Sequence, residues 1–259
     1  MNPTKTKTKT KKMKIKQILA LGGAGLFSLS VAQAATITWT EQGVITGDSF
    51  LTLAGATGNE VYGVDFGAGS VTTANGYTFA DDYTGAINGS GPVSGNMTIP
   101  SISQYNGWLN GQTTGDAGLD AVLANAVYGN TSANPGTLNN LTIGDTYNVL
   151  AFLDDNRGSA AGGTLFEVND GTAVSPTQLY GTYGSTPGNP LGGYLLGTFV
   201  ADATTQAFTV QNNGQNGNFS ANNDQFNGIL VETAPVPEPG VCALLGAGVM
   251  MLLGLRRKK

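Results

Sequence analysis

The chain has 259 residues, among them 12 basic and 17 acidic residues, no histidine and one cysteine, Cys242. The lack of histidine, and of any cysteine outside the C-terminal tail, excludes Ser-His-Asp and Cys-His catalysis, the usual zinc sites and an internal disulfide. Between residues 35 and 235 there are sixteen acidic residues and one basic residue, Arg157. A body with a single cation cannot neutralise several phosphates, so nucleic-acid binding is excluded as well.

The first 34 residues have the features of a secretory signal peptide. Seven lysines lie between Lys5 and Lys16, an apolar stretch covers residues 18–31, and residues 32–34 read Ala-Gln-Ala, with small residues at the positions that signal peptidase reads. We therefore predict cleavage between Ala34 and Ala35. An uncleaved anchor is the alternative, but the apolar stretch is short and contains three glycines.

Residues 35–233 are predicted to form one β-sandwich domain. Glycine is abundant, long amphipathic periods are nearly absent, and β-branched or aromatic runs are separated by turn signals such as Asn75-Gly76, Gly144-Asp145 and Asn169-Asp170-Gly171. Eight or more strands without alternating helices predict an all-β, antiparallel sandwich of the jelly-roll type. The predicted strands cover residues 36–40, 61–66, 77–79, 146–153, 164–168, 194–200, 206–211 and 227–232.

One short helix interrupts this pattern. Leu119, Val122, Leu123 and Val127 recur at helical spacing, and Asp116 stands where an N-cap is needed, so we predict a helix over residues 116–127. The segment 101–128 could instead be an irregular functional loop. The regular spacing favours a packing role.

Asp154, Asp155 and Arg157 form the one local group of opposite charges in the body. Arg157 could present its planar fork to a sugar hydroxyl or a carboxylate, which would make this group a ligand site. A structural clamp, in which Arg157 ties a loop to nearby acids or carbonyls, is the favoured interpretation. Glycosidases use a pair of carboxyl groups about 5 to 10 Å apart across the scissile bond, but neighbours in a strand point to opposite faces, so we predict no catalytic pair at Asp154 and Asp155.

Two other groups could bind a ligand. The Asn-rich segments 212–218 and 222–224 offer oxygen atoms to calcium but contain one anionic residue, so a solvated loop is favoured. Aromatic side chains in loop-like sequence could stack on a sugar ring or cover the ends of the core. These aromatic residues are Tyr105, Trp108, Tyr128, Tyr180 and Tyr183. We predict that folding requires no metal, no cofactor and no disulfide.

The C-terminal tail has three consecutive parts. A linker and motif cover residues 234–239, and the motif itself reads Val236, Pro237, Glu238 and Pro239. Two prolines keep this motif extended. An apolar run over residues 240–255 would make a helix of about 24 Å, short of the roughly 30 Å hydrocarbon core, so residues 240–259 are predicted to be a marginal transmembrane helix. The run ends in a basic stop made of Arg256, Arg257, Lys258 and Lys259.

This tail closely resembles the PEP-CTERM family of exported bacterial proteins, and the resemblance covers the tail alone. It implies recognition by a membrane protease-transferase, exosortase, in bacteria that make exopolysaccharide. The partners expected from both termini are therefore signal peptidase, exosortase and the membrane. The resemblance also implies that the chain is held by its C-terminal helix before processing and then reaches the cell surface or the extracellular matrix.

The body has a second resemblance, over about half its length. Residues 138–149, 152–157 and 197–206 look like uncharacterised exported jelly-roll domains, some of them distantly similar to carbohydrate-binding modules. Taken together, the sequence favours a structural or adhesive surface protein that is not an enzyme. A carbohydrate-binding module acting on exopolysaccharide is the alternative, and a glycoside hydrolase is third. The ligand, the oligomeric state, the fate of the tail, calcium binding and the start codon, Met1 or Met13, stay open.

Overall fold

The computed structural model describes residues 35–66, 71–81, 83–84, 95–99, 103–107, 109, 111–128, 136–156, 164–181, 191–212 and 225–234. All of them belong to one compact unit, Ala32–Lys259. The predicted signal peptide, the Pro-Glu-Pro motif and the predicted membrane helix lie outside the described residues. Of the helices in the described ranges, none has the length and the apolar character needed to cross a bilayer.

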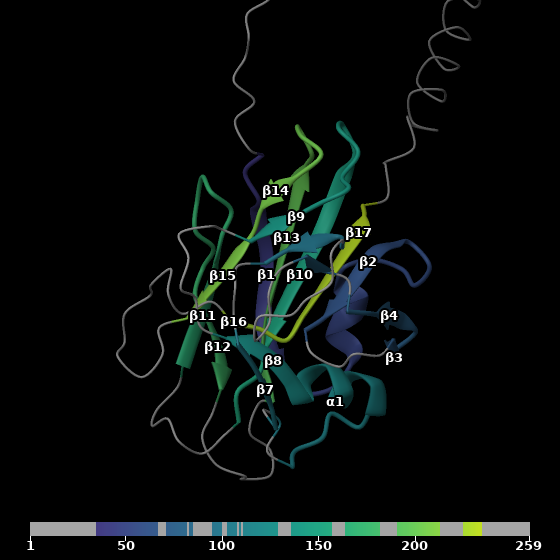
Figure 1. Cartoon of the computed structure of the whole chain (residues 1–259), viewed down its shortest axis with the longest axis vertical. Helices are drawn as coiled ribbons and strands as arrows, with labels where there is room; N and C mark the ends of the chain where they lie inside the picture. Colours follow the sequence, from purple (N-terminus) through teal and green to yellow (C-terminus); the bar gives the residue numbers. More distant parts are fainter. Residues whose placement is uncertain are drawn as a thin grey trace, which may run out of the picture. The chain divides into compact units, whose positions relative to one another are not determined.

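Five antiparallel strands form the central sheet (Figure 1). Each neighbouring pair is antiparallel, and neighbours in the sheet are mostly far apart in the chain. This agrees with the predicted all-β class and antiparallel pairing. Across the sheet the order is β1 (Thr38–Ile45), β13 (Gly192–Val200), β10 (Thr146–Leu153), β17 (Gly228–Thr233) and β2 (Glu60–Asp65).

A second layer of shorter strands covers one face of this sheet. Val149, Ala151 and Ile229 of the central sheet share one hydrophobic cluster with Phe166 and Phe208 of the second layer. Its pairings are antiparallel except between β5 and β6. The groups are β12 (Gln178–Gly181), β11 (Thr164–Asn169) and β15 (Thr209–Asn212); β14 (Gln206–Ala207), β9 (Thr137–Leu138), β6 (Met97–Thr98) and β5 (Tyr83–Thr84); and β16 (Gln225–Phe226), β8 (Asn125–Tyr128) and β7 (Ser103–Asn106).

The opposite face of the central sheet is covered too. A second hydrophobic cluster lies there. It includes side chains of the 3-10 helix η1 (Ser49–Leu53), of the hairpin of β3 (Thr72–Ala74) and β4 (Tyr77–Phe79), and of helix α1 (Ala117–Ala124). Phe152 of β10 packs edge-on against Phe50 and Phe79, with ring centroids 5.4 and 5.8 Å apart. The central strands are therefore buried on both faces, which explains why β10 reads as an almost continuous apolar run.

The predicted strands are found close to their expected bounds, with two informative differences. β1 begins two residues later than predicted and continues to Ile45. The predicted strand 206–211 is divided into β14 and β15, because the N–H of Phe208 donates to Gly136 and leaves the regular ladder. Asn75 and Gly76 both have positive φ, as the predicted tight turn between β3 and β4 requires.

The helix is confirmed at its start and shorter than predicted at its end. Asp116 is the N-cap, and its side chain accepts a hydrogen bond from the N–H of Leu119 at 2.8 Å. The helix stops at Ala124 instead of Val127, since Asn125–Tyr128 pairs with β7 and β16 as strand β8. The amide of Asn227 donates to the carbonyls of Leu123 and Asn125 and so satisfies groups at this end.

The close packing of α1 on β3 depends on the absence of a side chain at Gly118. A β-carbon there would overlap the carbonyl oxygen of Thr73 on β3. Gly→Ala in an exposed helix usually stabilises it by about 1 kcal/mol, but here we expect Gly118→Ala to lower the free energy of unfolding by about 1–3 kcal/mol. The melting temperature, followed by circular dichroism, should fall by about 2–12 °C.

Gly47→Ala is the matched control for this measurement. A β-carbon at Gly47 would meet only the carbonyl oxygen of Thr114 at 3.8 Å, an ordinary contact. We expect its melting temperature to stay within about 2 °C of the wild type. A Gly118→Ala protein that melts at or above the control would contradict the close packing of α1 on β3.

Candidate functional site

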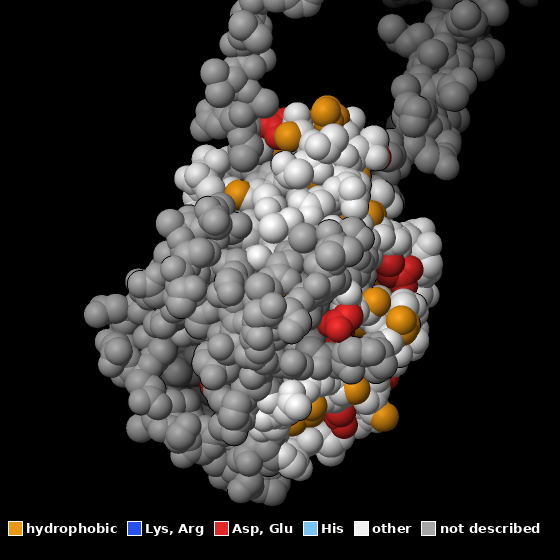
Figure 2. Space-filling model, viewed as in Figure 1, with side chains coloured by type: hydrophobic (Ala, Val, Ile, Leu, Met, Phe, Trp, Pro, Cys, Tyr) orange, Lys and Arg blue, Asp and Glu red, His pale blue; other side chains and the backbone are white. Residues whose placement is uncertain are grey.

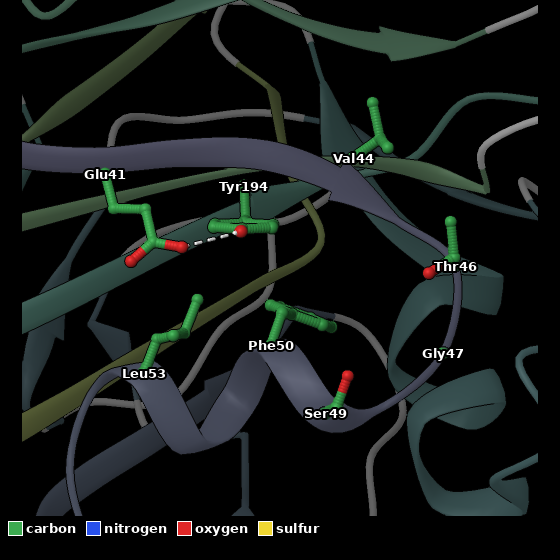
Figure 3. Close-up of a pocket in the computed structure, with 8 residues that line it drawn as sticks. All are labelled: Glu41, Val44, Thr46, Gly47, Ser49, Phe50, Leu53 and Tyr194. Atoms are coloured by element: carbon green, nitrogen blue, oxygen red, sulfur yellow. Dashed lines mark hydrogen bonds between the residues drawn. The ribbon is translucent and has the colours of Figure 1, made fainter.

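A small cavity lies between the end of β1 and helix η1 (Figure 3). Its volume is about 260 Å³, slightly below the roughly 300–1,000 Å³ that is common for drug-sized ligands. Its size suits one small molecule. The wall combines one carboxylate, three hydroxyl groups and apolar surface, from Glu41, Val44, Thr46, Gly47, Ser49, Phe50, Leu53 and Tyr194.

A β-bulge places Glu41 at this cavity. Trp39 pairs with Gly197 and Glu41 pairs with Leu196, so Thr40 is an extra residue in β1. Its hydroxyl donates to the carbonyl of Leu196 at 3.3 Å. Because side chains alternate along a strand, this insertion turns Glu41 to the face that it would not otherwise occupy. Glu41 thereby reaches the side of the sheet that carries Tyr194.

A glycine lets Tyr194 reach across to Glu41. Tyr194 lies opposite Gly43 in the sheet, and a β-carbon at Gly43 would sit against the Tyr194 hydroxyl and ring. With no side chain there, the ring lies over β1, and its hydroxyl donates to Oε1 of Glu41 at 3.1 Å (Figure 3). Phe50 of η1 stacks on the other side, with ring centroids 5.3 Å apart and ring planes 20° from parallel.

Electrostatics keep Tyr194 a hydrogen-bond donor. Burial, followed by the hydrogen bond to Glu41 and the charge of that carboxylate, raises the pKa of the Tyr194 hydroxyl above its usual value. Glu41 is on an exposed part of β1 and still has acceptor positions left for a ligand. An aromatic wall beside hydroxyl groups and an accepting carboxylate is suited to a small polyhydroxylated ligand.

The sequence-predicted site residues lie elsewhere or outside the described residues. Asp154 and Asp155 are buried just after β10, with exposed fractions of 0 and 8 %. Oδ1 of Asp154 accepts a hydrogen bond from the side-chain amide of Asn156 at 2.6 Å. The backbone N–H of Asp154 donates to the side-chain oxygen of Asn227 at 3.0 Å. These contacts connect the segment after β10 to Asn227, next to β17. The rest of the predicted clamp, Arg157, lies outside the described residues, as do the side chains of the five predicted aromatic residues.

Sequence reasoning missed the Glu41–Tyr194 pair. Glu41 follows the predicted strand 36–40 directly, and Tyr194 opens the predicted strand 194–200, so each residue was placed near its true element. Nothing local in either segment indicates the bulge at Thr40 or the pairing of β1 with β13. A carboxylate directly after a predicted strand was the one available signal.

Two further carboxylates, those of Asp65 and Glu232, are fully buried. Neither oxygen of Asp65 or of Glu232 accepts a hydrogen bond within the described part of the chain, although both side chains are 0 % exposed. Burial, and then the nearby carboxylate of Asp81, raises the pKa of Asp65 to about 8. Burial, and then the carboxylate of Glu60, raises the pKa of Glu232 to about 7. Ionising either group inside the fold is unfavourable.

The raised pKa of Asp65 predicts a pH dependence of stability. Between the ordinary pKa of 3.8 and about 8, the folded state holds a proton that the unfolded state has released. The stabilisation is therefore complete below about pH 4 and is lost as pH rises through 8, by at most about 1.4 kcal/mol per pH unit. Asp65→Asn should flatten this decline, because a neutral amide replaces the protonated carboxyl.

The measurement is chemical denaturation of wild type and Asp65→Asn at pH 5, 6, 7 and 8, in buffer that contains a metal chelator. The difference in unfolding free energy between the two proteins isolates Asp65 from the other titrating groups. We expect the variant to gain stability relative to wild type as pH rises. A difference that stays constant across the four pH values would contradict the assigned role of Asp65.

Comparison of the chain with protein-family models, with curated protein sequences and with solved structures finds no match.

Proposed function

We propose that this chain is an exported, surface-sorted protein with a structural or adhesive role in the extracellular matrix. In this proposal the signal peptide is removed at Ala34, and the tail is processed after the Pro-Glu-Pro motif has been recognised by an exosortase. The observation that carries the proposal is the order of the tail: an extended motif, an apolar run and a basic stop. The body in this proposal is a jelly roll, which its long-range antiparallel pairings favour.

The composition of the body supports an extracellular role. The described residues include no lysine, arginine or histidine. In Figure 2 the described part of the face in view shows acidic side chains and isolated hydrophobic ones among backbone and other side chains. A strongly acidic surface favours solubility and resists self-association. Two hydrophobic clusters stabilise the fold without a disulfide, which suits a body that contains no cysteine.

Processing of the tail is directly testable. In cells that express the full-length protein, we expect mass spectrometry of the surface fraction to find a C-terminus that lacks residues 256–259. Deleting Arg256 to Lys259 should leave the protein misplaced, because these cations hold the end of the helix on the cytoplasmic side. Surface protein with an intact Lys259 would mean that the helix is a permanent anchor.

The Glu41–Tyr194 cavity favours one more specific activity, binding of a carbohydrate such as exopolysaccharide. Tyr194, Phe50 and the hydroxyls of Ser49 and Thr46 would contact one sugar residue, with Glu41 accepting from its hydroxyls. Glu41 is the only carboxylate in the described wall, whereas glycosidases use two, so this proposal includes no hydrolysis.

A glycan-binding screen on the full-length protein, followed by calorimetry with the best glycan, tests this proposal. We expect Glu41→Gln to raise the dissociation constant at least tenfold, since a hydrogen bond to a charged group contributes about 1.5–3 kcal/mol. Gln42→Ala is the matched control, because Gln42 is an exposed neighbour on β1 that does not line the cavity. Equal losses in both variants, or no glycan bound by wild type, would leave the structural role alone.

A further inference from the structure

Two glutamates lie directly opposite each other at one end of the central sheet. Glu60 begins β2, and it pairs with Glu232 of β17 across an antiparallel ladder that shifts register between Val231 and Glu232. Like charges in this position normally destabilise a sheet. The pair therefore requires either a proton or a counter-charge.

Glu232 is the buried member of the pair. It is 0 % exposed, and neither of its oxygens accepts a hydrogen bond from any described residue. Gly55 lies against its carboxylate, and any β-carbon at Gly55 would overlap Oε2 of Glu232. The carboxylate of Glu232 thus fills the room that a side chain at residue 55 would need, and its oxygens accept no hydrogen bond within the described part of the chain. A buried carboxylate in this state is costly unless something positive binds to it.

Glu60 and Tyr77 complete the surroundings of Glu232. Oε2 of Glu60 accepts from the N–H of Gly58 at 2.6 Å, which leaves Oε1 for another interaction. Glu60 is partly exposed and lines a cavity of about 350 Å³, so its carboxylate is open to solvent. Burial, and then the charges of Glu232 and Glu60, raises the pKa of Tyr77, whose hydroxyl donates to the carbonyl of Gly55 at 2.7 Å. The charges of Glu60 and Glu232 therefore both act on the hydroxyl of Tyr77.

No basic side chain among the described residues can neutralise this pair, since those residues include no lysine, arginine or histidine. We propose that Glu60 and Glu232 bind a divalent cation, Ca²⁺, with the carboxylates as its anionic ligands. The remaining ligands would be water and backbone carbonyls such as that of Gly55. Ca²⁺ accepts oxygen ligands in variable geometry, whereas Mg²⁺ requires a near-ideal octahedron and Zn²⁺ prefers nitrogen and sulfur.

This proposal revises the sequence-based prediction of no metal, which rested on the lack of histidine and cysteine in the body and on acidic residues that are scattered through the sequence. The described residues hold no cluster of three or more His, Cys, Asp or Glu side chains, so the site has two anionic ligands. Two anionic ligands suit a weak site, with a dissociation constant of about 10⁻⁴–10⁻³ M as in extracellular calcium modules. The proposal does not depend on sorting or on carbohydrate binding.

The test uses the full-length protein, stripped of metal and then titrated with CaCl₂, with MgCl₂ as a parallel arm. Calorimetry should detect one Ca²⁺ site, and saturating Ca²⁺ should raise the melting temperature by several degrees. Terbium, which replaces calcium in oxygen sites, should give luminescence sensitised by the neighbouring Tyr77 and lost on addition of Ca²⁺. Glu232→Gln should weaken Ca²⁺ binding at least tenfold and remove both effects.

The controls separate a cation site from a simple protonated carboxyl. Without Ca²⁺, Glu232→Gln should melt at or above wild type, because the amide removes the repulsion, so lost binding does not reflect unfolding. Asp65→Asn changes the buried carboxylate at the other end of β2 and should leave Ca²⁺ binding unchanged. The proposal is overturned if Ca²⁺ has no effect on wild type, if it stabilises Glu232→Gln equally, or if Asp65→Asn is the variant that loses binding.

Discussion

Strand β10 supplies side chains to both hydrophobic clusters, and the other elements are arranged around this double burial. Val149 and Ala151 face the second layer of strands, while Leu150 and Phe152 face η1, the β3–β4 hairpin and α1. Because the two sets alternate along one strand, a shift of register by one residue would exchange the two clusters. The positions of β13 and β17 on either side of β10 are fixed by the same constraint.

Both candidate sites lie where this apolar packing ends. Tyr194 and Phe50 are members of the second cluster, and their outer edges form the wall of the Glu41 cavity. Asp65 and Glu60 occupy the two ends of β2, each beside another carboxylate. The rigid sheet thus holds polar groups in surroundings that they would not adopt in a flexible loop. The raised pKa values of Asp65, Glu232 and Tyr194 come first of all from burial by neighbouring residues.

Local patterns predicted the elements that are specified locally. The apolar run of β10, the turn at Asn75 and Gly76 and the N-cap Asp116 depend on residues that are close in sequence, and each was found where expected. The all-β class followed from the same signals. The end of α1 was predicted three residues too late, because the amide of Asn227 and the pairing of β8 decide it from far along the chain.

The sites could not be predicted for the same reason. Glu41 meets Tyr194 only because β1 pairs with β13, because Thr40 is bulged and because Gly43 has no side chain. Glu60 meets Glu232 only through the ladder between β2 and β17. No spacing of residues in the sequence indicates that Glu41 contacts Tyr194 or that Glu60 pairs with Glu232. Composition did supply one relevant fact: residues 35–235 contain a single basic residue, Arg157, against sixteen acidic ones, which gives the pairing of two glutamates its significance.

The bulge in β1 has a consequence for how copies of this protein meet. β1 is an outer strand of the central sheet, and a regular outer strand is a template on which another chain can add a strand. At Thr40 the even spacing of N–H and C=O groups is broken, and the next residue carries a charge. The bulge therefore interrupts the regular edge on which a second copy could add a strand along β1. The same irregularity turns Glu41 toward its cavity.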